Sequence, residues 1–201
     1  MQHALDHLRA SDPILGRLID QTGPYLIEMR PPNYETLVKA IVLQQLSGKV
    51  AEVIFARLLA AAGGPVLTAE SVLRLRPARL RAIGLSKQKT VYIRELARRT
   101  LSGKLDLAAL AAVSDEEVLD RLTALKGIGP WTVHMFLIFA LGRPNVMPSG
   151  DLGIRAAVRK VYGLAATPTP AEVDRMARRW HPYCTVASWY LWRSLEAKAG
   201  L

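Results

Sequence analysis

The apolar positions along this chain recur with the spacing of α-helices over most of its length. Alternating runs rich in β-branched residues, which are typical of strands, are scarce. Several periodic segments begin after a side chain that can accept a hydrogen bond from the amides of a first helical turn. The pattern therefore predicts an all-α protein of about ten helices.

Helix-start residues and glycine turns set the boundaries of these segments. Helices are predicted to begin at Asp12–Pro13, Asn33, Ser47 and Thr68. Further helices are predicted over residues 86–101, 114–125, 130–141, 151–162, from about 170, and over 185–199. Ser114 and Glu117 have the spacing of a capping box. No repeat, low-complexity tract or flexible linker interrupts the helices, so we expect two tightly packed helical lobes.

The charge of the chain indicates what kind of partner it has. It contains 27 Lys and Arg against 17 Asp and Glu, which gives a formal net charge of +10 and a pI near 10.1. Such an excess is typical of proteins that bind a polyanion, and it favours nucleic acid over an acidic protein or a membrane.

Cysteine and histidine content restricts the chemistry. The single Cys184 cannot form an internal disulfide and excludes a four-cysteine zinc or iron–sulfur site. The four histidines lack the spacing of metal ligands, so we assign no metal site. Neither a signal peptide nor an apolar run of membrane-spanning length occurs. We expect a soluble cytoplasmic protein, associated with the nucleoid if the source is bacterial.

The segment Leu125-Lys126-Gly127-Ile128-Gly129 before Pro130 has the features of an anion-binding turn. Glycine permits positive φ and close backbone approach, while the amides of the second helix and a neighbouring lysine suit a phosphate. A turn that only connects two packed helices is the alternative. The basic net charge favours DNA, although phosphate contacts alone select no sequence.

Asp151 follows Pro-Ser-Gly and precedes an apolar helix, so its side chain should lie at a helix N-terminus. A simple helix cap is the alternative to catalysis there. Trp131 and Trp192 are candidates for stacking on an extruded, positively charged base, although aromatic residues at helical spacing usually pack in a core.

Three stretches together give a resemblance: IVLQQLS at 41–47, LKGIGPWT at 125–132 with the chain on to Asp151, and RWHPYCTVASWYLWRS at 179–194. In order and interval they resemble the helix-hairpin-helix (HhH-GPD) DNA glycosylases, 3-methyladenine DNA glycosylase II branch, in a compact form without the N-terminal β domain. The resemblance covers nearly all of the chain after about residue 30. It implies lobes of residues 34–143 and of 1–33 plus 144–201, with the active-site cleft between them.

The resemblance also implies roles for particular residues. Asp151 would be the catalytic carboxylate, and the base pocket would contain Trp131, Trp192 and Met135, the last at a position where relatives carry an aromatic residue. Gln45 or Leu46 would enter the gap left by a flipped nucleotide, although Leu46 taken alone could equally pack in a core. The predicted DNA-binding residues are Lys126, Gly127, Gly129, Thr132, Gln45, Leu46, Lys87 and Lys89.

The function implied is a monofunctional glycosylase that releases alkylated, 3-methyladenine-type bases from double-stranded DNA and leaves an abasic site. Members that also cleave the backbone carry a lysine where this chain has Trp131, so no lyase step is expected. No cofactor is required, although the family's hairpin can bind a monovalent cation through backbone carbonyls. We expect a monomer. The alternatives are a DNA-binding protein without catalysis and a glycosylase for oxidised or mismatched bases.

Overall fold

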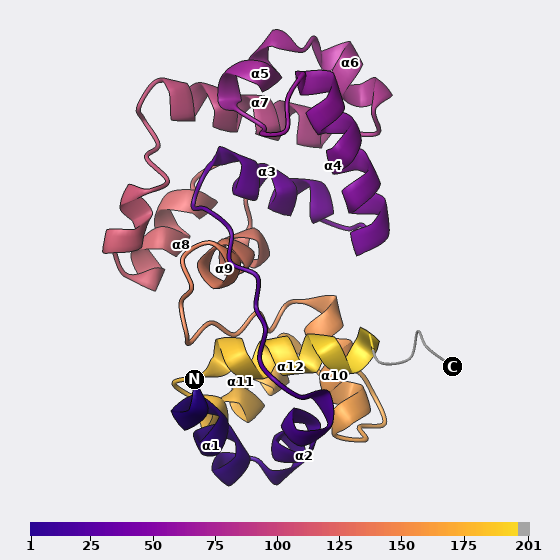
Figure 1. Cartoon of the computed structure of the whole chain (residues 1–201), viewed down its shortest axis with the longest axis vertical. Coiled ribbons are helices and arrows are strands. Elements are labelled where there is room, and N and C mark those ends of the chain that lie inside the picture. The colour runs from indigo at the N-terminus through magenta and orange to yellow at the C-terminus, as the bar shows by residue number, and fades with distance from the viewer. Residues whose placement is uncertain (197–201) are drawn as a thin grey trace. The chain divides into compact units, whose positions relative to one another are not determined.

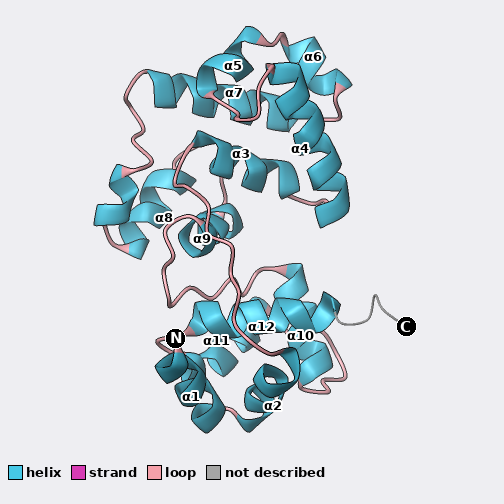
Figure 2. Cartoon of the chain, viewed as in Figure 1, coloured by secondary structure: helices cyan, strands magenta, loops and turns pink. Residues whose placement is uncertain are grey.

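The computed structural model describes residues 1–196, and these residues form helices and loops with no strand among them (Figure 2). The all-α prediction is confirmed. The described residues contain twelve α-helices and two short 3-10 helices, more than predicted, because Gln2–Ser11 (α1) and Pro77–Ala82 (α6) begin without a capping side chain. The predicted end of the last helix, at Ala199, lies outside the described residues.

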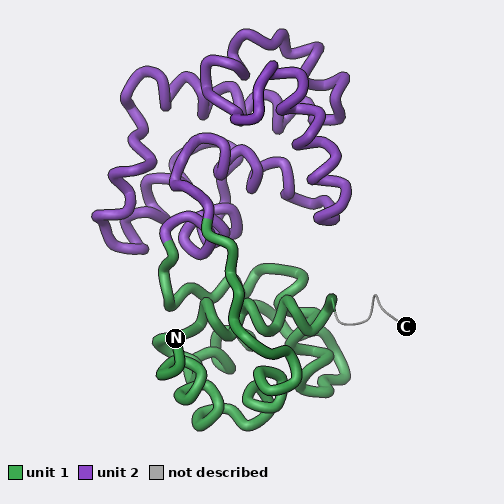
Figure 3. The backbone as a smooth tube through the Cα atoms, viewed as in Figure 1, with its two compact units in different colours: residues 1–29, 142–201 green, residues 30–141 purple. Residues whose placement is uncertain are grey.

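The helices belong to two compact units, which Figure 3 shows in different colours. Unit 2 is Arg30–Leu141, and unit 1 combines Met1–Met29 with Gly142–Leu201. Unit 2 contains α3 (Tyr34–Leu43), α4 (Gly48–Ala62), α5 (Ala69–Arg74), α6, α7 (Lys87–Leu101), η1 (Ala109–Ala112), α8 (Asp115–Thr123) and α9 (Pro130–Phe139). Unit 1 contains α1, α2 (Pro13–Thr22), α10 (Leu152–Val161), α11 (Pro170–Ala177), η2 (Arg178–Trp180) and α12 (Cys184–Glu196), and the α-helices are labelled in Figure 1.

The core of unit 2 is built around α3, which packs against α4, α7 and α9. Leu37 and Ile41 of α3 are completely buried there. The α9 helix is apolar nearly all round, and Val133, Phe136 and Ile138 are buried with almost no exposure. A helix of that composition must be enclosed by its neighbours, and this burial fixes the direction in which its first turn points.

Local capping accounts for most helix starts. Asp12, Asn33 and Thr68 each accept hydrogen bonds from first-turn amides, which confirms these three predictions. Ser47 does precede α4, but its side chain makes no capping hydrogen bond.

The predicted capping box at Ser114 is only half formed. The Ser114 hydroxyl accepts from the amide of Glu117, whereas the Glu117 carboxylate forms an ion pair with Arg121. Two predicted helix ends are also too late, since α8 ends at Thr123 and α9 at Phe139.

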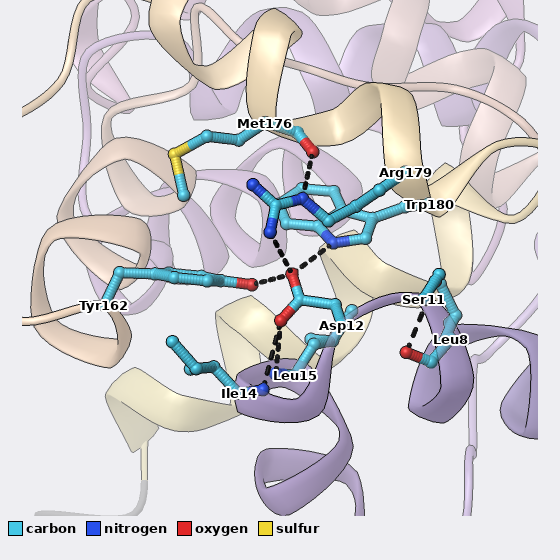
Figure 4. Close-up of polar contacts among 9 residues, drawn as sticks. All are labelled: Leu8, Ser11, Asp12, Ile14, Leu15, Tyr162, Met176, Arg179 and Trp180. Atoms are coloured by element: carbon cyan, nitrogen blue, oxygen red, sulfur yellow. Dashed lines mark hydrogen bonds and ion pairs between the residues drawn. The ribbon is translucent and has the colours of Figure 1, made fainter.

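Asp12 is only 1% exposed. Figure 4 shows its polar contacts in unit 1. Its Oδ1 accepts from the amides of Ile14 and Leu15, both at 3.1 Å. Its Oδ2 accepts from the Tyr162 hydroxyl at 2.6 Å and from Trp180 Nε1 at 2.9 Å. One carboxylate therefore ties the α1–α2 corner to the end of α10 and to η2.

The pKa of Asp12 reflects this environment. Burial raises it, but the hydrogen bonds from Tyr162, Trp180 and Leu15 and the charge of Arg179, 3.7 Å away, outweigh burial and leave the pKa below its usual value of 3.8. A carboxyl group with a lowered folded pKa stabilises the fold above its unfolded pKa. That contribution is lost as the pH falls through the lower, folded value.

Replacing Asp12 by Asn should therefore lower the free energy of unfolding at neutral pH by about 3 kcal/mol, because an amide has one acceptor oxygen and cannot accept at the positions of both Oδ1 and Oδ2. Below about pH 4 the free energy of unfolding should fall less steeply with decreasing pH in the variant than in the parent, because the variant has no carboxylate to protonate at this position. Denaturant unfolding at several pH values measures both effects. Asp20→Asn, at an exposed carboxylate paired with Arg9, is the control and should cost under about 1 kcal/mol. An Asp12→Asn protein as stable as the parent would contradict this role.

Candidate active site

The predicted hairpin is formed by α8, a turn over residues 124–129, and α9, which begins with Pro130 at its first position. Leu125 and Ile128 are buried and anchor the turn, whereas Lys126 is exposed. Gly129 is the N-cap, so no side chain covers the start of α9. Such a start suits an anion, because first-turn amides lack intrahelical acceptors and the helix dipole is positive at this end.

Gly127 can only be glycine in this turn. Its φ is +90°, and an added Cβ would lie 2.0 Å from Cδ2 of Tyr92, a residue of α7. The Tyr92 ring therefore occupies the space of a side chain at position 127. Gln44 is the C-cap residue of α3. Its Nε2 donates to the Gly127 carbonyl at 2.9 Å and to the Thr132 hydroxyl at 2.8 Å. The turn is thus held between α7 and the end of α3.

The hairpin borders a groove with a volume of about 480 Å³. Besides Gln44 and Tyr92, it is lined by five residues predicted to bind DNA: Gln45, Lys89, Lys126, Gly127 and Gly129. We call this the hairpin groove. Lys87 is exposed but does not line it, and neither does Leu46.

Two of the residues predicted to bind DNA also have partners within the protein. Lys89 Nζ donates to the carbonyls of Val42 and Gln44 at 2.8 and 2.7 Å, and partial burial lowers the pKa of this ammonium. Thr132 is 1% exposed, and its hydroxyl accepts from Gln44. Both side chains therefore hold the end of α3 and the hairpin, and their contacts with DNA stay predictions.

Residues 45–50, at the end of the α3–α4 connection and in the first turn of α4, are exposed. Gln45 has a φ of +58° and is the only residue other than glycine with positive φ among residues 1–196. Leu46 is 36% exposed, and its amide donates to the Leu43 carbonyl at 3.0 Å. Packing of Leu46 in a core, the alternative left open by the sequence, is excluded.

Asp151 is the N-cap of α10 in unit 1. Its Oδ1 accepts from the Ile154 amide at 2.8 Å and from Trp192 Nε1, on α12, at 2.9 Å. Gly153 leaves room for this pair, since a Cβ there would lie 2.9 Å from Asp151 Oδ1 and 3.3 Å from Trp192 Cδ1. No other Asp or Glu occurs between residues 121 and 171. Capping and a chemical role are therefore compatible for this carboxylate.

The predicted pocket residues lie in different parts of the chain. Trp192 contacts Asp151 within unit 1, and Trp131 is half-buried in the first turn of α9 in unit 2. Met135 is buried and lines a cavity of about 180 Å³ in unit 2, together with Leu43 and Phe136.

The other aromatic residues of α12 serve packing. Trp189 makes an edge contact with Tyr25 at 5.1 Å, and the Tyr190 hydroxyl donates to the Gly23 carbonyl at 2.9 Å. Trp192 is therefore the aromatic residue of this helix that contacts the candidate carboxylate.

Three residues of the site were not predicted: Gln44, Tyr92 and Gly153. Gln44 lies inside the quoted IVLQQLS stretch, which was a signal for its importance. The partners of Gln44 and Tyr92 are 83 residues and about 35 residues away along the chain, so local patterns could not identify them.

Within residues 1–196, no group of three His, Cys, Asp or Glu side chains is arranged to hold a metal ion. Over the same residues, no helix is both long and apolar enough to cross a membrane.

Comparison with known proteins identifies the family of this chain. A family model described as HhH-GPD superfamily base excision DNA repair protein matches residues 38–182. DNA-3-methyladenine glycosylase 1 of Schizosaccharomyces pombe is 37% identical over 194 residues, which cover 94% of this chain and 85% of that protein.

The chain is also similar to solved structures of 3-methyladenine DNA glycosylases. The S. pombe 3-methyladenine DNA glycosylase in complex with abasic DNA matches with a TM-score of 0.90 and 36% identity, over 96% of this chain and 97% of the other. A DNA-3-methyladenine glycosidase from Bacillus halodurans matches with a TM-score of 0.80 and 35% identity, over 95% of this chain and 88% of the other.

The contact between Gly127 and Tyr92 can be tested by substitution. Gly127→Ala should lower the free energy of unfolding by about 2 to 3 kcal/mol, because alanine disfavours positive φ and its Cβ overlaps the ring. The double variant with Tyr92→Ala should recover the steric part, and a double-mutant cycle in urea measures it. Gly129→Ala is the control, since a Cβ there meets nothing within 4 Å. Equal costs for Gly127→Ala with and without Tyr92 would contradict the clamp.

Proposed function

Because the chain belongs to the HhH-GPD superfamily of base excision DNA repair proteins, we propose that it is a monofunctional DNA glycosylase. Its substrates are alkylated, 3-methyladenine-type bases in double-stranded DNA, and its product is an abasic site. The observation that carries the proposal is Asp151, fixed by the Ile154 amide and the Trp192 indole in a chain that also holds a glycine hairpin suited to phosphate. The names of its relatives in S. pombe and B. halodurans support the same substrate class.

The reaction replaces the bond between C1′ of the sugar and the base by a bond from C1′ to a water oxygen. A purine methylated on a ring nitrogen carries positive charge, so it departs as a neutral base with the electron pair of the broken bond. The water gives up one proton, which passes to the carboxylate or to solvent. Positive charge develops on the sugar as the bond breaks, and a carboxylate beside it stabilises that charge.

A single carboxylate is sufficient for such a leaving group. Ordinary glycoside hydrolysis needs a second carboxyl group as an acid to protonate the departing oxygen, whereas a cationic base needs no proton. Asp151 stabilises the sugar cation or orients the attacking water, with the Trp192 indole holding Oδ1 in place. Trp131 occupies the position where lyases of the family carry lysine, so no Schiff base forms at that position.

Residues of both units contribute to the proposed DNA binding and base recognition. The start of α9 with Lys126 binds a backbone phosphate, and Leu46 or Gln45, both exposed, fills the gap left by the flipped nucleotide. Trp192 of unit 1 and Trp131 of unit 2 are each candidates for stacking on a cationic base.

No cofactor takes part in this reaction. If a monovalent cation binds the hairpin carbonyls, it shares them with the protein's own donors, since the Gly127 carbonyl already accepts from Gln44. We place the enzyme in the cytoplasm as a monomer, associated with the nucleoid if the source is bacterial, because its substrate is chromosomal DNA.

Asp151→Asn tests the catalytic role. The amide keeps the size of the side chain but cannot supply negative charge, so base release from methylated duplex DNA should fall by about 100-fold or more while DNA binding persists. Chromatography of the freed bases and a binding titration measure the two properties. Asp174→Asn, at an exposed aspartate of α11, is the matched control. No release by the parent, despite tight DNA binding, would favour the non-catalytic alternative or a different lesion.

Lys126→Ala tests the phosphate contact. Loss of one contact should weaken binding to any duplex sequence and reduce the slope of log K against log salt concentration by about one. Lys87→Ala should act in the same direction if Lys87 also contacts phosphate. Lys104→Ala, at another exposed lysine of unit 2, is the control. An unchanged affinity and slope would exclude the contact for the lysine concerned.

A further inference from the structure

Gln44 connects two parts of unit 2 that the proposed function uses separately. Its side-chain amide donates one hydrogen bond to the Gly127 carbonyl in the hairpin turn, at 2.9 Å, and another to the Thr132 hydroxyl in the first turn of α9, at 2.8 Å. A single NH₂ group therefore spans the point where the turn becomes a helix. Glutamate or methionine has no such pair of donors.

The backbone of Gln44 is held as well. Lys89 Nζ, from α7, donates to the Val42 carbonyl at 2.8 Å and to the Gln44 carbonyl at 2.7 Å. These carbonyls lie at the C-terminal end of α3, where no further helical turn supplies amide donors. Residue 44 is consequently fixed by α7 through its carbonyl and by the hairpin through its side chain.

The residues that follow immediately are Gln45 and Leu46. Gln45 has a φ of +58°, a conformation that a residue with a side chain rarely adopts and that neighbouring contacts must hold. The peptide groups on both sides of Gln45 are held, because the Gln44 carbonyl accepts from Lys89 and the Leu46 amide donates to the Leu43 carbonyl. The direction in which Gln45 and Leu46 leave the protein surface is thus set relative to the hairpin.

We propose that Gln44 is a positioning residue that couples the phosphate-binding hairpin to the exposed Gln45–Leu46 segment. When the hairpin engages a backbone phosphate, Gln44 fixes the place at which this segment enters the duplex. This inference rests on the proposed function. It assigns to Gln44 an effect on base extrusion, and not on the affinity for undamaged DNA.

Two nearly isosteric variants test the coupling. Gln44→Met removes both donors, and Thr132→Val removes one acceptor without altering the segment itself. The single-turnover rate of base release at saturating enzyme should fall by about tenfold or more for Gln44→Met and by less for Thr132→Val, because small misplacements of reacting groups cost large factors in rate. The dissociation constant for undamaged duplex should stay within about threefold of the parent.

Fluorescence can measure base extrusion in a duplex in which no glycosidic bond is cleaved. In a duplex with 2-aminopurine beside an abasic-site analogue, the parent should increase the fluorescence on binding, and Gln44→Met should reduce that increase. The effects of the two substitutions should be less than multiplicative in the double variant, because both remove the same hydrogen bond. Gln21→Met, at an exposed glutamine of α2, is the control.

Two results would overturn the coupling. One is a rate and a fluorescence response in Gln44→Met equal to those of the parent; the other is an affinity for undamaged duplex that falls in proportion to the rate. If Gln44→Met does not fold, Thr132→Val and its response decide in the same way. A parent that releases no base but changes 2-aminopurine fluorescence would contradict the proposed function, and loss of that change in the variants would still support the coupling.

Discussion

The proposed chemistry of this protein depends on one carboxylate, Asp151, which accepts from two rigid donors. Oδ1 of Asp151 accepts two hydrogen bonds. One comes from the Ile154 amide, which has no acceptor within α10 because it lies in the first turn, and the other from the indole N–H of Trp192 on α12. Both donors are rigid, since one belongs to the backbone and the other to a half-buried ring. Gly153 is required beside them because a larger residue would displace the carboxylate or the indole. The side chain that caps α10 is therefore also held in a fixed orientation, as its proposed role requires.

The hairpin in unit 2 also contains a helix start whose first-turn amides lack intrahelical acceptors, and we propose that these amides bind a phosphate. Here the N-cap is Gly129, so that no side chain competes with an incoming phosphate. The turn is kept in shape by contacts from outside it, from Tyr92 against Gly127 and from the side chain of Gln44. A negative side chain at one helix start and a bare backbone at the other suit a reaction in which a cation forms on a polyanion.

The sequence predicted features that depend on neighbouring residues better than contacts between distant residues. Asp12, Asn33 and Asp151 were identified as helix caps because a cap is specified within four residues. Lys89 and Thr132 were assigned to DNA because their sequence context is basic or adjoins the hairpin, and that assignment stays a prediction. Local patterns could not show that both also bond to residues at the end of α3, more than 40 residues away.

The candidate site was also predicted only in part. The HhH-GPD motifs identified Asp151, the hairpin glycines and Trp192, and the structure places Trp192 on the carboxylate. Gln44 was passed over in favour of Gln45, because its role depends on hydrogen bonds that only the folded unit shows.

The most direct test of the central claim, that a lone fixed carboxylate acts on bases already carrying positive charge, is the pH dependence of base release for a charged and a neutral lesion. We predict that release of a cationic methylpurine stays level from about pH 6 to pH 8, because its departure requires no protonating group, and that neutral hypoxanthine in the same duplex is released far more slowly. A steep fall in methylpurine release with rising pH, or equal release of hypoxanthine, would show that an acid takes part and would contradict this account.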